Sequence, residues 1–147
     1  MIKGKEKVII VSFYDDEKLD RSVKREEMLK KYCESKGYKV ENLFRVMQYW
    51  ETDYNLWTFR DCIDESIKGK AKCERIDKVI IYTTKELTIM EEEIVMYNAL
   101  LNLYGVKLET IEEGILGKDM HCFSSITYDE SIKEQNKEFI VNEDMPF

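Results

Sequence analysis

The amino-acid sequence predicts a single α/β domain over residues 1–147, built on a mainly parallel sheet with helices on both faces. Short, almost continuous apolar runs such as KVIIVS (7–12) and DKVIIYT (77–83) are typical of strands that are buried on both faces. The segments between such runs carry apolar residues at helical spacing and end at glycines. Strands that alternate with helices pair in parallel through right-handed crossovers. We therefore expect a three-layer sandwich.

The first half of the chain supplies two strands and two helices. The strand over 7–12 precedes a helix over 18–36, in which Leu29 belongs to an apolar face. Residues 38–46 alternate imperfectly between apolar and polar side chains, which predicts a second strand. Residues 54–68 have apolar side chains three and four positions apart, which predicts a second helix.

The second half repeats this alternation and then loses it. Residues 77–83 form a third strand, and residues 87–104 form a helix whose apolar spacing alternates between three and four. Residues 106–111 predict a fourth strand. Beyond it the pattern weakens to a short edge strand over 121–128 and a short amphipathic helix over 129–140.

Composition is that of one folded globular domain. The chain has 147 residues, of which 44% are apolar and 12% aromatic, enough for a core without disulfides. No apolar run reaches the roughly 20 residues that span a membrane, and we see no signal-peptide pattern. We expect a cytoplasmic protein without a cofactor, whose scattered cysteines are reduced thiols. The cysteines are Cys33, Cys62, Cys73 and Cys122.

Charge is distributed unevenly along the chain. Residues 76–147 contain 6 lysines and no arginine against 15 acidic residues, and the whole chain has a net charge of −7. Because lysine and arginine dominate affinity for nucleic acids, this half is poorly suited to binding DNA unaided. We expect a protein partner or a second copy of the chain, with only weak binding of DNA by the chain alone.

Four segments occur in the order and spacing of the serine recombinase catalytic domain, the family of resolvases and invertases. They are VIIVS (8–12), MLKKYCESKGYKV (28–40), KVIIYTTKELT (78–88) and LLNLYGVKLETIEEG (100–114). The chain resembles this family over residues 7–114, and residues 115–147 form a divergent C-terminal extension. The resemblance implies a sheet with strand order 2-1-3-4. It also implies a link to DNA recombination, DNA integration and mobile elements.

The same resemblance implies a nucleophile and a catalytic shell. The family attacks a DNA phosphodiester with a serine hydroxyl, and Ser12 falls on that serine. The family's arginine two residues earlier falls on Ile10, and its tyrosine falls on Val8. An aspartate and an arginine of the family fall near Val46 and Leu56. Both arginines of the family's Asp-Arg-Leu-Ser-Arg motif are missing. That motif falls on Lys85, Glu86, Leu87, Thr88 and Ile89.

The missing arginines decide the activity that we expect. One donor preorganised for the transition state is typically worth ~3–4 kcal/mol, so three losses suggest about 9–12 kcal/mol. Even with incomplete additivity, this corresponds to roughly 10⁶-fold in rate. The carboxylate of Glu86 would also repel a phosphate. We therefore expect Ser12 to be a vestigial nucleophile and the domain to be a pseudoenzyme that acts as a binding or regulatory protein, with a protein partner or as a homodimer.

Other interpretations stay open. The main alternative is an active resolvase-type site-specific recombinase that uses Ser12 as the nucleophile and obtains basic residues from a partner. A flavodoxin-like or receiver-like domain with an acidic pocket at Asp15 or Asp16 is a third. For Ser12 itself, the structural interpretation is a serine at a strand end that bonds to backbone groups of the following turn.

Two groups of residues are weak candidates for a metal site. Asp15, Asp16 and Glu17 could hold a divalent cation, but acidic residues ahead of a helix are more often solvated and favoured by the helix dipole. His121 and Cys122 lack further ligands at metal-binding spacing. We expect no metal.

Bulky aromatic residues follow the second strand, where the recombinase family has a loop of small residues. Such side chains either pack on the core or form a partner-binding surface. The residues of this aromatic cluster are Tyr49, Trp50, Tyr54 and Trp57.

Overall fold

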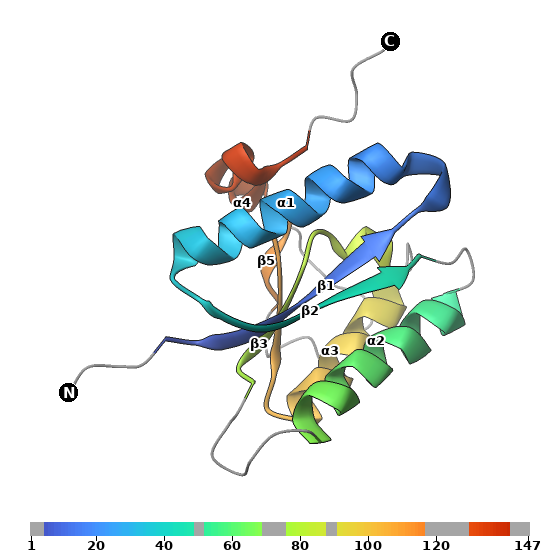
Figure 1. Cartoon of the computed structure of the whole chain (residues 1–147). Helices are drawn as coiled ribbons and strands as arrows, with labels where there is room; N and C mark the ends of the chain where they lie inside the picture. The colour runs from blue at the N-terminus through green and yellow to red at the C-terminus, as the bar shows by residue number, and fades with distance from the viewer. Residues whose placement is uncertain (1–4, 49–51, 69–75, 88–90, 117–129, 142–147) are drawn as a thin grey trace, which may run out of the picture.

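The computed structural model describes residues 5–48, 52–68, 76–87, 91–116 and 130–141. These residues form an α/β fold around a five-stranded, mostly parallel sheet with the strand order β2-β1-β3-β4-β5 (Figure 1). β1 (Lys7–Tyr14) pairs in parallel with β2 (Lys39–Met47) on one side and with β3 (Lys78–Ile81) on the other. β4 (Lys107–Thr110) is parallel to β3, and β5 (Gly114–Ile115) is antiparallel to β4.

Helices cover both faces of the sheet (Figure 1). α1 (Leu19–Lys36) lies on one face, where the short helix α4 (Glu130–Gln135) and the 3-10 helix η3 (Lys137–Phe139) lie beside it. α2 (Thr52–Lys68) and α3 (Glu91–Leu103) lie on the opposite face. Within the described ranges, no helix is both long and apolar enough to cross a membrane.

Alternation along β1 explains why the core has two parts. Successive side chains of a strand point to opposite faces of the sheet. Ile9, Val11 and Phe13 belong to the cluster that packs against α2 and α3. Val8 and Ile10 belong to the cluster that packs against α1 and Phe139 of η3. The apolar run that predicts a doubly buried strand is therefore confirmed.

The end of α1 shows how a local signal sets an element boundary. Gly37 has a φ of 73°, in the left-handed region that glycine adopts without a steric penalty. Its amide donates to the carbonyl of Glu34, and the amide of Tyr38 donates to that of Cys33. These two bonds satisfy carbonyls at the helix end in the manner of a Schellman motif. The helix ends where the sequence predicts.

The structure contains the strand order 2-1-3-4 that the resemblance implies and adds β5 to it. The helix expected over 87–104 begins at Glu91, because residues 84–86 form the separate 3-10 helix η2 (Thr84–Glu86). The capping residue of η2 is Thr83, whose hydroxyl accepts from the amide of Lys85 at 3.4 Å. The edge strand expected over 121–128 lies outside the described residues.

Candidate functional site

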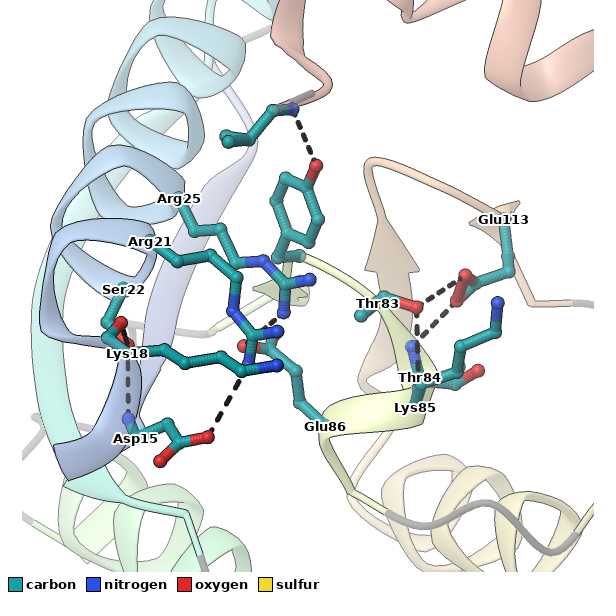
Figure 2. Close-up of polar contacts among 12 residues, drawn as sticks. Asp15, Lys18, Arg21, Ser22, Arg25, Thr83, Thr84, Lys85, Glu86 and Glu113 are labelled. Atoms are coloured by element: carbon teal, nitrogen blue, oxygen red, sulfur yellow. Dashed lines mark hydrogen bonds and ion pairs between the residues drawn. The ribbon is translucent and has the colours of Figure 1, made fainter. Parts of the chain in front are cut away.

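Polar side chains gather at the carboxyl edge of the sheet, where β1 and β3 end (Figure 2). β1 leads through the 3-10 helix η1 (Asp16–Lys18) into α1 on one face. β3 leads through η2 toward α3 on the other face. The two connections therefore diverge from neighbouring strands, which defines a topological switch point. In open α/β sheets, ligands bind outside the carboxyl ends of the strands at such a point.

Three basic side chains extend from the start of α1 toward the loop after β3 (Figure 2). They belong to Lys18, Arg21 and Arg25, which lie three and four positions apart and so share one side of the helix. A guanidinium nitrogen of Arg21 lies 3.6 Å from a carboxylate oxygen of Asp15. Cations near a helix N-terminus oppose the helix dipole. The local physics of the helix therefore does not account for this basic group.

Glu86 is the buried carboxylate that faces this basic group (Figure 2). Only 3% of the residue is exposed, and its Oε2 accepts from Nη1 of Arg25 at 3.2 Å. Its other oxygen, Oε1, is buried without a hydrogen-bond partner. Burial raises the pKa of Glu86 to about 7, although Arg25 and, more weakly, Arg21 lower it. Glu86 therefore changes its charge near neutral pH.

Arg25 links Glu86 to the C-terminal segment. Its guanidinium carbon lies 4.3 Å from the centre of the Tyr82 ring, a cation–π contact. The hydroxyl of Tyr82 accepts from the amide of Val141 at 2.8 Å. One continuous set of contacts thus runs from Glu86 through Arg25 of α1 to Tyr82, which directly follows β3, and then to Val141 after η3.

Glu113, in the turn between β4 and β5, fixes the loop after β3. Its Oε2 accepts from the Thr83 hydroxyl at 2.9 Å, and its Oε1 accepts from the Thr84 amide at 2.7 Å (Figure 2). The hydroxyl of Thr110 donates to the same carboxylate at 3.1 Å. Three donors on one side chain hold the loop in place. The position of Glu86 is therefore set from β4 as well as from β3.

Ser12 lies inside β1, two residues before its end, and not in the following turn. It is 1% exposed and by alternation faces α1, as Ile10 does. Its neighbour in β2 is Arg45, whose guanidinium donates to Glu26 at 2.7 and 3.1 Å. Val8 and Ile10, which fall on the tyrosine and arginine of the recombinase family, are both fully buried. Ser12 is thus enclosed in apolar strand packing and close to a cation that is already paired.

The acidic residues after β1 act as local structure. Asp15 caps η1, since its Oδ1 accepts from the amide of Glu17 at 3.0 Å. Asp16 and Glu17 are exposed. Among the residues that the structure describes, no three His, Cys, Asp or Glu side chains are grouped in a way that could hold a metal ion. His121 and Cys122 lie outside those residues.

The structure describes only part of the predicted aromatic cluster. Trp57, on α2, is 55% exposed, the exposure expected of a side chain that is available to a partner. Tyr54 lies in the same helix, but its side chain is not described, and Tyr49 and Trp50 lie outside the described residues. The partner surface therefore stays a prediction that only Trp57 supports.

Several residues of the site were missed by reasoning from the sequence. Lys18, Arg21 and Arg25 could have been noticed as cations on one side of a helix start, where the dipole disfavours them. Glu86 was identified through the resemblance, but only as a carboxylate in place of an arginine and not as a buried partner of Arg25. It closes the sequence Thr-Thr-Lys-Glu, the pattern of a capping box, which marks the start of a helix three residues earlier. No local signal connects Glu113 with the loop after β3.

No family model, curated protein or solved structure matches this chain.

Proposed function

We propose that this chain is a serine-recombinase-like domain that works by binding and does not cleave DNA. The resemblance of residues 7–114 to that family supplies the assignment. Two structural features support it: the order of the four parallel strands and the place of Ser12 on β1. The proposal includes a resolvase-like three-layer sandwich and a role in the cytoplasm, in recombination or in the biology of mobile elements.

One observation is the main support for the proposal that the chain does not cleave DNA. The resemblance puts an arginine where this chain has Glu86, and Glu86 is buried and paired with Arg25 at 3.2 Å. A phosphoryl transition state needs positive charge around its oxygens. Here Arg25 is held by the carboxylate of Glu86, and Ser12 is 1% exposed. A phosphodiester at this site therefore meets a buried hydroxyl at Ser12 and, in Arg25, a guanidinium that Glu86 already holds.

DNA strand trapping tests this proposal directly. The full chain is incubated with supercoiled DNA and then denatured, and DNA joined to protein is measured alongside a Ser12→Ala control. We expect no covalent product from either protein. An adduct that forms with the natural chain and disappears in Ser12→Ala would overturn the proposal.

The binding role has its own test. Trp57→Ala removes an exposed aromatic side chain from α2, whereas Leu103→Ala removes an apolar side chain that is 84% exposed on α3. We expect a protein captured from the source cell by the natural chain to be lost in Trp57→Ala and kept in Leu103→Ala. Equal capture by both variants would remove the aromatic cluster from the proposal.

The second candidate is an active resolvase-type recombinase. Arg21 and Arg25 favour it, because they lie near the start of α1, which follows β1, and Ser12 by alternation points to the face of the sheet that α1 covers. In that reaction the Ser12 oxygen bonds to phosphorus, and the DNA hydroxyl leaves with a proton. The reaction requires Arg25 to exchange Glu86 for the phosphate. Under this candidate, Glu86→Gln would increase the yield of covalent adduct in the strand-trapping experiment, whereas the first proposal expects none.

A further inference from the structure

The outer side of α3 is apolar and exposed. Met96 is 56% exposed and Leu103 is 84% exposed, and Ala99 between them is exposed as well. Spacings of three and four positions place these residues in one line along the helix, which we call the α3 stripe. The opposite side of α3 packs into the core. A helix that is apolar on both sides is typically covered on both sides.

The absence of charge distinguishes α3 from the other two long helices. No charged residue occurs between Glu93 and Lys107. Exposed positions of α1 and α2 carry charges of both signs, among them Lys24, Glu27, Lys31, Arg60 and Asp61. An exposed apolar stripe indicates an interaction surface. Because the α3 stripe has no lysine or arginine, it lacks the groups that bind nucleic acid.

Contacts with α2 hold α3 in a fixed position. The two helices lie on the same face of the sheet (Figure 1). The rings of Phe59 on α2 and Tyr97 on α3 meet edge to face, with their centres 5.4 Å apart. At the end of α3, the hydroxyl of Tyr104 donates to Asp64 of α2 at 3.1 Å. A surface on a helix that is already ordered loses less conformational entropy when it binds.

We propose that two copies of this chain associate through the α3 stripe, with the two helices antiparallel around a two-fold axis at Ala99. A surface that pairs with itself must be self-complementary. Met96 and Leu103 lie three and four positions from Ala99 in opposite directions. In an antiparallel pair, Met96 of one copy therefore lies beside Leu103 of the other, and the contact occurs twice. The small side chain of Ala99 at the centre allows the helices to approach closely.

Charges at the two ends of α3 favour a second copy in this orientation. The first turn of α3 contains three glutamates (91–93), and the exposed Lys107 follows the helix at its other end. In an antiparallel pair, the acidic turn of each copy lies at the level of Lys107 of the other copy. A parallel pair would bring the two acidic turns together. Complementary charges at the rim of an interface fix its orientation.

The charge of the whole chain favours this surface for a dimer. Two copies of a chain with a net charge of −7 repel each other, and this repulsion is weakest where no charged side chains face one another. The inference goes beyond the proposed function, because it depends neither on Ser12 nor on the resemblance. Capture of a different protein through Trp57 does not require the dimer, so the two proposals can fail separately.

Solution mass is the first measurement. Sedimentation equilibrium of the full chain in reductant, from about 1 μM to 1 mM, should show a monomer–dimer equilibrium. A chain that stays monomeric throughout this range overturns the proposal.

Methyl NMR identifies the surface that pairs. Between dilute and concentrated samples, we expect the methyl resonances of Met96, Ala99 and Leu103 to shift. Leu19 is the matched control, since it is 52% exposed on α1, on the other face of the sheet. Its methyl resonances should stay in place. A dimer in which the α3 stripe gives unchanged resonances overturns the proposal, and so does a stripe that responds only when another protein is added.

Truncation of one leucine tests the contribution of the stripe. Leu103→Ala removes a contact from both halves of the interface, and we expect the dissociation constant to rise by about 30-fold. Leu19→Ala makes the same chemical change on the other face and should leave the constant within about 2-fold. Circular dichroism confirms that both variants fold. Equal dissociation constants for Leu103→Ala and the natural chain would contradict the proposal.

Charge variants at Ala99 test the position of the axis. A two-fold axis at Ala99 places this residue opposite its own copy. Ala99→Glu and Ala99→Lys should therefore each be monomeric at 100 μM, because each brings like charges together. An equal mixture of the two variants should form a heterodimer more tightly than either variant forms a homodimer. A mixture that associates no better than the separate variants would show that the axis is not at Ala99 and overturn the proposal.

Discussion

Glu109 and Glu86 are two buried carboxylates that contact the same helix and have opposite surroundings. Glu109 is 1% exposed and accepts from the hydroxyls of Tyr32 and Tyr38 at 2.5 and 2.8 Å and from Nζ of Lys78 at 3.0 Å. Glu86 is 3% exposed, but one of its oxygens has no hydrogen-bond partner. Buried polar groups in native proteins normally have hydrogen-bond partners. Glu86 is therefore the carboxylate of the two that needs a functional explanation.

The two regions also differ in the pKa shifts of their groups, namely the partners of Glu109 in one and Glu86 in the other. Burial alone would lower the pKa of Lys78, but hydrogen bonds with Tyr38 and Glu109 hold it above its ordinary value. Burial and the carboxylate of Glu109 raise the pKa of Tyr32. All partners of Glu109 therefore keep one charge state at physiological pH. Glu86, with a pKa raised to about 7 by burial, does not. The contacts around Glu109 are therefore structural, whereas the charge of Glu86 can change with its surroundings.

We expect the largest effect from a substitution that removes Glu109 from its hydrogen-bonded group. Glu109→Leu leaves the ammonium of Lys78, whose side chain is 7% exposed, without its buried partner. Removal of one partner of a buried ion pair costs about 3–5 kcal/mol. We expect the free energy of unfolding in urea to fall by this amount. The double variant Lys78→Met/Glu109→Leu should lose less than the single one, and a larger loss would contradict the role given to the pair.

Glu86 should make the stability of the chain depend on pH. Its pKa is about 7 in the folded chain against an ordinary value of 4.5, so the folded state holds the proton more tightly. The stabilisation is complete below pH 4.5 and is lost as pH rises through 7, a change of about 3 kcal/mol. Glu86→Gln cannot titrate. The difference in unfolding free energy between this variant and the natural chain should therefore vary over that window. A constant difference would show that Glu86 is not perturbed.

Tyr82 and Tyr38 allow the same chemical change to be made in both regions. Tyr82→Phe keeps the ring under Arg25 and removes the acceptor for the amide of Val141, so we expect a loss of about 1 kcal/mol. The amide of Val141 should then exchange faster. Tyr38→Phe removes a donor from the charged group around Glu109, and we expect it to cost more, about 1–3 kcal/mol. If urea unfolding shows a larger loss of stability for Tyr82→Phe than for Tyr38→Phe, the distinction between the two regions is wrong.

Arg21 should give the smallest effect. Its contact with Asp15 is at 3.6 Å between partly exposed side chains, so Arg21→Gln should change stability by less than ~1 kcal/mol. Because Arg21 lowers the pKa of Glu86, its loss should move that pKa further up. Titration of the Glu86 carboxyl by NMR measures this shift. A pKa that stays the same or falls would mean that Arg21 does not act on Glu86.

Much of the fold follows from patterns within single segments. The apolar run of β1 predicts a strand buried on both faces, and Gly37 predicts the end of α1, because each depends on residues close together in the chain. The start of α3 was placed too early, since Leu87 is apolar and at helical spacing but follows a separate 3-10 helix. β5 has only two residues, too few for a periodic pattern.

The sequence by itself determined the alternation of strands and helices and pointed to Ser12 and Glu86 through the resemblance. Only the tertiary structure decided what surrounds them. Arg25 and Glu86 are 61 positions apart, and the contact between Tyr32 and Glu109 spans 77. Local hydrophobic periodicity specifies which face of an element is buried, but it does not specify which polar side chains meet across the sheet. Those contacts, and the burial that raises the pKa of Glu86, arise only when the strands have taken their order.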